Sequence, residues 1–196
     1  MLIEDDQLED EPPAPPVDAP RNRRRRVVLA ALLFLGTVFI ALTARLFVWP
    51  DSGVPAHADA IIVFSGEGDR LTVGLELASR GVAPNLVISV GSPDQAANDR
   101  CNRPMAGVTV YCFVPHPGTT QGEARYAAQL ADENHWQSLI LVTSTPQDWR
   151  AHLRTSRCYS GKIYVATAPL PRHEWPGAIV YEWGATLKAL LLQRGC

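Results

Sequence analysis

Two short polar segments of this sequence carry residues that can bind an anion. The first, residues 65–70, holds Gly66 and Gly68 ahead of Arg70 and directly follows an apolar run. Glycines allow the backbone to approach a ligand closely, and an arginine at a helix start can face an anion. The Gly-x-Gly spacing lacks the third glycine of a dinucleotide-binding fingerprint and any Walker lysine, so a simple tight turn explains it equally well.

The second segment places hydroxyl groups ahead of another arginine. Thr143 and Ser144 end the most strongly apolar run of the predicted domain, and Arg150 follows them. Arg70 and Arg150 together can hold a phosphate or a carboxylate through parallel N–H donors. The sequence therefore predicts an anion site that both arginines share with neighbouring hydroxyl groups.

Thr120 and Glu123 open a predicted helix with the spacing of a capping box. In that motif each side chain hydrogen-bonds the backbone of the other residue, so a local role explains both residues without a ligand. Glu123 is also the plausible general base if the site is catalytic. The histidines and cysteines lack the spacing of metal ligands, and we expect neither a metal nor another cofactor.

Alternating strand and helix patterns position these segments. Short apolar runs predict strands at residues 59–64, 85–90, 108–114, 138–144 and 162–166. Helical patterns lie at residues 71–81, 120–134, 146–156 and 181–193. Such alternation predicts an α/β domain, a three-layer α/β/α sandwich on a mostly parallel sheet. Ligands of such sheets bind at the carboxyl ends of the strands, where the polar segments lie.

Residues 27–48 form an apolar run that predicts one transmembrane helix. About 20 residues at 1.5 Å each span the roughly 30 Å hydrocarbon layer of a membrane. The apolar part of a signal peptide usually has about 7 to 15 residues, so the length favours an uncleaved anchor. A cleaved signal peptide is the alternative, with Leu42-Thr43-Ala44 as its cleavage site.

Charge predicts which side of the membrane each part occupies. Arginines at residues 21–26 precede the apolar run, and basic flanks stay in the cytoplasm. Residues 1–26 are acidic and proline-rich before these arginines, which predicts a disordered cytoplasmic tail. After a linker at residues 49–58, residues 59–196 form the extracytoplasmic domain of a single-pass cell-membrane protein. The net charge of −2 argues against a nucleic-acid partner.

The four cysteines agree with this topology, because all of them follow the apolar run. Disulfides persist outside the cytoplasm. Four cysteines permit three pairings. We favour Cys101 with Cys112, which bracket a short loop, and by elimination Cys158 with Cys196.

Five short motifs in order resemble the DUF218 family, also called YdcF-like. They are residues 59–63 with the glycine turn and Arg70, residues 80–84, residues 120–124, residues 141–144, and Arg150-Ala151. The resemblance covers roughly Asp59 to the C-terminus and implies a Rossmann-like α/β/α sandwich. Members commonly have N-terminal anchors and face the bacterial periplasm or cell exterior, and several resemble proteins linked to envelope integrity, vancomycin tolerance or peptidoglycan-precursor supply.

The resemblance also implies a set of site residues. They are Arg70, Thr120, Glu123, Thr143, Ser144 and Arg150. Where many members carry a histidine after the threonine-serine pair, this chain has Gln147, which cannot transfer a proton near neutral pH. Glu182 matches a recurring acidic residue near the family's C-terminus.

These residues lead to three alternative functions. We expect a domain that binds an anionic small molecule or a lipid phosphate in cell-envelope or peptidoglycan-precursor homeostasis. The alternatives are an enzyme that acts on a phosphorylated envelope metabolite, and an interaction scaffold without a ligand.

Overall fold

The structure is a computed structural model that describes residues 20–50, 53–66, 68–91, 95–101 and 103–196. The predicted acidic tail therefore lies mostly outside the described residues. The chain divides into two compact units, Met1–Ile40 and Ala41–Cys196. The second unit includes the segment that the sequence assigned to a linker, since Gly53 forms an isolated antiparallel bridge with Val165.

The first described element is a long apolar helix, α1, at Pro20–Thr43, which continues as a π-helical turn, η1, at Ala44–Val48. The continuous helical stretch Asn22–Val48 has 27 residues and is long and apolar enough to cross a membrane. Its length and composition fit a membrane span, and an N-terminal signal sequence has the same properties. It contains the whole predicted apolar run.

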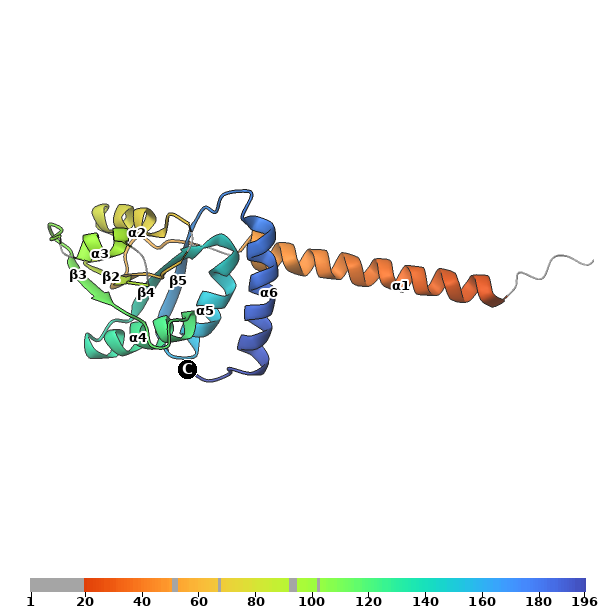
Figure 1. The fold of residues 1–196 in the computed structure, drawn as a ribbon. Coiled ribbons are helices and arrows are strands. Elements are labelled where there is room, and N and C mark those ends of the chain that lie inside the picture. Colours follow the sequence, from red (N-terminus) through yellow and green to blue (C-terminus); the bar gives the residue numbers. More distant parts are fainter. Residues whose placement is uncertain (1–19, 51–52, 67, 92–94, 102) are drawn as a thin grey trace, which may run out of the picture. The chain divides into compact units, whose positions relative to one another are not determined.

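Five parallel strands form one sheet in the order β3-β2-β1-β4-β5 (Figure 1). The strands are β1 at Ala60–Val63, β2 at Asn85–Ser89, β3 at Thr109–Phe113, β4 at Ser138–Ser144 and β5 at Lys162–Ala168. The chain builds β1 to β3 in one direction and then returns to the other side of β1 with β4. Open parallel sheets bind ligands beside such a reversal, which here lies between β1 and β4.

Four of the described helices pack on this sheet and shield its apolar strands. They are α2 at Arg70–Ser79, α3 at Gln95–Cys101, α4 at Thr120–Glu133 and α5 at Asp148–Ser156. Helix α6 at Trp175–Leu191 packs against α5 and against a short 3-10 turn, η2, at Thr145–Gln147. Alternate residues of β1 enter different core clusters: Ile61 packs with Leu77 of α2, and Ile62 packs with Ala127 of α4. The predicted α/β fold on a parallel sheet is therefore confirmed.

Two helices differ from the sequence prediction. Helix α3 lies in the region between the second and third strands, which was interpreted as a loop; its seven residues are polar or small and offer no apolar stripe. Helix α6 begins at Trp175, six residues before the predicted start, with Pro176 in its first turn. Proline is compatible with that position because its missing N–H has no intrahelical acceptor there.

The two predicted cysteine pairs are confirmed. Cys101 at the end of α3 bonds to Cys112 of β3, and Cys158 after α5 bonds to Cys196. The second bond fixes the C-terminal end of the chain to the domain. Both disulfides fit an extracytoplasmic domain, because the cytoplasm keeps thiols reduced.

Asp59 connects the starts of β1 and β4. Its Oδ2 accepts hydrogen bonds of 2.8 Å from the backbone N–H groups of Gln137 and Ser138 and from the Ser138 hydroxyl. Burial acts to raise the pKa of the Asp59 carboxyl, but these three hydrogen bonds outweigh it and hold the pKa below its usual range. The ionised carboxylate therefore stabilises the fold above about pH 4, and this stabilisation is lost as the pH falls through the lowered pKa.

We expect Asp59→Asn to lower the free energy of unfolding near neutral pH by about 1 kcal/mol, because solvent screens this partly exposed group. The difference from the wild type should shrink below about pH 4, where the wild-type carboxyl is protonated. Denaturation at neutral and acid pH checks both statements. Glu76→Gln is the matched control, because the ion pair of Glu76 with Arg80 is exposed and its charged atoms are 3.8 Å apart. An equal loss in both variants would contradict the role of Asp59.

Candidate functional site

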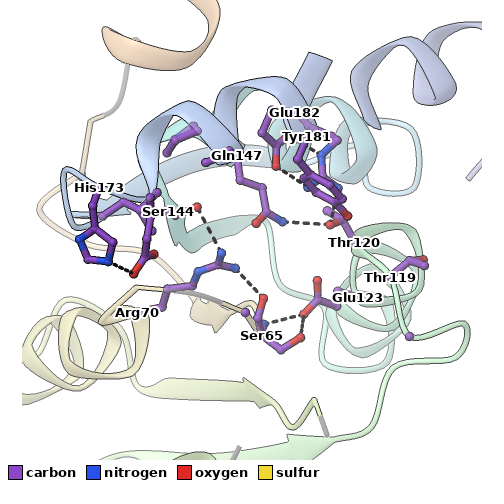
Figure 2. Close-up of a pocket in the computed structure, with 18 residues that line it drawn as sticks. Ser65, Arg70, Thr119, Thr120, Glu123, Ser144, Gln147, His173, Tyr181 and Glu182 are labelled. Carbon is purple, nitrogen blue, oxygen red and sulfur yellow. Dashed lines mark hydrogen bonds and ion pairs between the residues drawn. The ribbon is translucent and has the colours of Figure 1, made fainter. Parts of the chain in front are cut away.

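A cavity of about 630 Å³ lies at the carboxyl ends of the strands, beside the reversal between β1 and β4 (Figure 2). Segments that follow β1, β3, β4 and β5 line it, and the first half of α6 completes the wall. Several of the predicted site residues come together here. They are Gly66, Arg70, Thr120, Glu123, Ser144 and Arg150.

Two predicted residues do not line this cavity. Thr143 is fully buried in β4, and its neighbour Ser144 reaches the cavity instead. Successive strand residues point to opposite faces of a sheet, so the two hydroxyls cannot serve the same site. Gly68 lies in the turn before α2 and lines a smaller neighbouring hollow.

Arg70 is the first residue of α2 and is only 5% exposed. Its Nη1 donates to the Ser65 carbonyl oxygen at 2.5 Å and its Nη2 donates to the Ser144 hydroxyl at 3.2 Å. The guanidinium thereby bridges the ends of β1 and β4. Gly66 lies beside it with a φ of +123°, and an added Cβ would stand 3.1 Å from the guanidinium nitrogens. A glycine is required here both for the backbone conformation and for the space that Arg70 occupies.

Glu123 is buried in the first turns of α4 and faces the end of β1. Its Oε1 accepts from the backbone N–H of Ser65 at 2.6 Å and from the Ser65 hydroxyl at 2.9 Å. Burial raises the pKa of the Glu123 carboxyl, against the Ser65 hydrogen bonds and the nearby Arg70 charge, which act to lower it. Its other oxygen points away from Ser65, toward the cavity (Figure 2).

The predicted capping box of Thr120 and Glu123 is wrong. The N-cap of α4 is Thr119, whose side chain accepts from the Gly122 backbone N–H at 3.4 Å. With the cap one residue earlier, Glu123 stands one position too far along the helix to reach the cap backbone. One helical position is a rotation of about 100 degrees, which turns Glu123 toward Ser65 instead.

Arg150 is the centre of a buried network between α4, α5 and α6. Its Nε and Nη2 donate to the two carboxylate oxygens of Glu182 at 2.6 and 2.7 Å, and its Nη1 donates to the Thr120 hydroxyl at 2.7 Å. Gln147 also donates to Thr120, at 2.9 Å. Arg150 therefore lines the cavity, but its parallel donors already hold Glu182. Gln147 supports the Thr120 hydroxyl.

The charges of the cavity are arranged in pairs. Arg150 is balanced by Glu182 through direct hydrogen bonds, whereas Arg70 interacts with Glu123 electrostatically. Protonation of Glu123 removes one negative charge that lies near Arg70. The electrostatic potential of the cavity is therefore more positive when Glu123 is protonated.

The sequence analysis named Glu182 of α6, but it did not select Ser65 or the other residues of α6 at the cavity. Ser65 directly follows β1, so the rule that sites lie at the carboxyl ends of strands was sufficient to select it. Gly177 and Tyr181 of α6 also line the cavity. No sequence signal connects them to it, because they are far along the chain from the strand ends. Within the described part of the chain, no group of three or more histidine, cysteine or acidic side chains can hold a metal ion.

Gly122 allows α4 to begin close to the preceding loop. An added Cβ at Gly122 would stand 2.0 Å from the Pro117 carbonyl oxygen, which is backbone and cannot rotate away. We expect Gly122→Ala to lower the free energy of unfolding by about 2 to 3 kcal/mol. Gly184→Ala in α6 is the control, since nothing lies within 4 Å of its added Cβ, and a helix gains up to about 1 kcal/mol from this change. Thermal denaturation of both variants compares them, and equal melting temperatures would refute the close contact.

Comparisons of the chain with models of protein families, with curated proteins and with solved structures found no match.

Proposed function

We propose that this chain is a membrane-anchored protein with an extracytoplasmic domain of the DUF218 (YdcF-like) kind, a three-layer Rossmann-like sandwich. In this proposal the domain binds a phosphate-bearing small molecule or lipid phosphate and acts in cell-envelope or peptidoglycan-precursor homeostasis. The apolar helix and the two disulfides support the location. The buried Arg70 in the strand-end cavity is the observation that carries the ligand class.

Arg70 suits an anion because its charge is buried and oriented. The two hydrogen bonds described above go to oxygens of Ser65 and Ser144, which hold the guanidinium at the wall of the cavity. A phosphate in the cavity would meet this guanidinium together with the Ser144 hydroxyl. Arg150 adds positive potential behind Thr120, although its direct partner is Glu182. Burial of the ligand away from water strengthens each of these contacts.

Thermal-shift measurements on the full chain in detergent test this proposal. The probes are inorganic phosphate, nucleotides, sugar nucleotides and polyprenyl phosphates, with wild type and Arg70→Gln compared. We expect at least one probe to raise the melting temperature of the wild type, and this shift to be lost in Arg70→Gln. Arg80→Gln, at the exposed C-cap of the same helix, should keep the shift. If no probe stabilises the wild type, the interaction scaffold becomes the better explanation.

An enzymatic function is the second candidate, and the contact between Ser65 and Glu123 favours it. A serine hydroxyl that donates to a buried carboxylate at 2.9 Å has the arrangement of a nucleophile with its general base. Glu123 would accept the Ser65 proton as the hydroxyl oxygen attacks a phosphoryl group, and would return that proton to the departing alcohol oxygen as its bond to phosphorus breaks. Water would then hydrolyse the phosphoserine to release inorganic phosphate, with Arg70 stabilising the charge that develops in both steps. Release of inorganic phosphate from phosphomonoesters, abolished in both Ser65→Ala and Glu123→Gln, would establish this function. Saturable binding without turnover would leave the domain as a binding protein.

A further inference from the structure

Helix α6 has an exposed apolar stripe along one side. Val180, Leu187 and Leu191 are 74%, 48% and 61% exposed. They are spaced seven and four residues apart, which places them on one face of a helix. The opposite face is buried against the domain through Glu182, Thr186 and Ala189. The stripe is therefore an exposed apolar face of α6, separate from the face that packs on the domain.

The same helix contacts the end of the long apolar helix. Trp183 donates its indole N–H to the Thr43 hydroxyl at 3.1 Å. Its ring also packs edge to face against Phe47, with the ring centroids 5.3 Å apart, and Phe47 is fully buried. All three residues belong to the compact unit Ala41–Cys196. Helix α6 is thus fixed to the last turns of the Asn22–Val48 stretch.

The position of Thr43 gives the depth of this contact in a membrane. About 20 residues from Val27 onward fill the hydrocarbon layer and end near Leu46. Thr43 then lies within one turn of the boundary between acyl chains and headgroups. Because Trp183 hydrogen-bonds Thr43, the part of α6 around Trp183 lies at that boundary too. Tryptophan is enriched at this level of membrane proteins.

We propose that α6 lies in the outer interface of the membrane, with Val180, Leu187 and Leu191 inserted among the lipids. This inference rests on the membrane anchor in the proposed function, but not on the ligand. Lys188 and Arg194 are exposed near the stripe and suit anionic headgroups. The domain then has a second contact with the bilayer. Since Tyr181 of the same helix lines the cavity, the cavity lies close to the membrane surface.

Photocrosslinking to lipid tests the proposal in the full chain. In the test variant, the photoreactive residue benzoylphenylalanine replaces Leu187. The variant is reconstituted in vesicles of phosphatidylethanolamine and phosphatidylglycerol that contain an alkyne-tagged phospholipid. Phe34, in the middle of the apolar helix, is the positive control, and Val114, an exposed apolar residue after the opposite edge strand β3, is the negative control. We expect the lipid adduct at position 187 to exceed that at position 114 by at least about five-fold. Leu191 is the second test position if the first variant does not fold.

Each remaining outcome overturns the proposal in a distinguishable way. Adducts at position 34 but only background at positions 187 and 191 would show that α6 faces water. Crosslinks from position 187 to a second copy of the chain, in place of lipid, would show that the stripe is a dimer interface. No lipid adduct at position 34 would overturn the anchor itself, and with it the membrane part of the proposed function.

Discussion

Glu182→Ala should lower the free energy of unfolding by about 3 to 5 kcal/mol, the largest single loss that we expect in this domain. Glu182 and Arg150 are 4% and 7% exposed and form a bidentate pair. Removal of the carboxylate leaves the guanidinium buried without its counter-charge. Part of the effect will extend to Thr120, which accepts from the same guanidinium. Chemical denaturation of the full chain in detergent measures the loss.

The double variant Arg150→Met with Glu182→Leu separates the cost of an orphaned charge from the value of the pair. Apolar replacements of similar volume remove both charges together, and such changes are often neutral or stabilising. We expect the double variant to recover most of the stability that Glu182→Ala loses. A loss below about 1 kcal/mol in the single variant would show that solvent reaches the pair and screens it.

Glu123→Gln should strengthen anion binding at pH values above the raised pKa of Glu123, and it should remove the pH dependence that this carboxyl causes. In the wild type, burial raises the pKa of Glu123, so its carboxyl stays protonated to a higher pH than an exposed glutamate. As the pH rises through this raised pKa, the carboxylate forms beside Arg70 and competes with the bound anion. We therefore expect wild-type affinity to fall with rising pH, and the glutamine variant to bind at least about ten-fold tighter once the wild-type carboxyl has ionised, a difference of about 1.4 kcal/mol.

Sulfate is a suitable probe because its charge is constant over this range, and calorimetric titration measures its affinity at several pH values. Glu133→Gln is the matched control, since Glu133 lies at the far end of the same helix and its carboxylate accepts from Gln129. If the glutamine variant at position 123 binds sulfate no better than the wild type at high pH, the carboxylate does not compete with the ligand. Loss of all binding in that variant would instead show that Glu123 itself holds the ligand.

The contributions of Glu123 and Asp59 to folding stability change with pH in opposite directions, because their pKa values are shifted in opposite directions. A raised pKa means that the contribution of Glu123 to stability is present below its unfolded pKa and is lost as the pH rises through the folded pKa. A lowered pKa means that the contribution of Asp59 is lost as the pH falls. Glu123→Gln should therefore flatten the stability profile on its alkaline side, and Asp59→Asn on its acid side.

Gln147 belongs to the buried network around Thr120. Its side chain donates to Thr120 and is only 6% exposed. An amide satisfies that acceptor at every pH, whereas a histidine would change its donors on titration. Gln147 therefore supports the wall of the cavity.

Most of the fold was predictable from the sequence because its signals are local. Continuous apolar runs such as Ser138–Ser144 have one low-cost environment, a strand covered on both faces, and the structure places this run in β4. Alternation with helical patterns then requires parallel pairing. The cysteine pairs follow from their small number and from the short loop between Cys101 and Cys112. Helix α3 was not predictable in this way, because it carries no apolar stripe.

The sequence by itself determined the elements, the parallel sheet, the apolar N-terminal helix and the edge of the sheet at which polar residues gather. The tertiary structure decided what those residues do. It pairs Arg150 with Glu182, turns Glu123 onto Ser65 through the position of a single helix cap, and brings α6 over the cavity. The physical reason is the distance along the chain over which each signal acts. Apolar periodicity depends on residues that are close in sequence. A buried charge is instead paired with a group that the packing of distant elements places within a few ångströms.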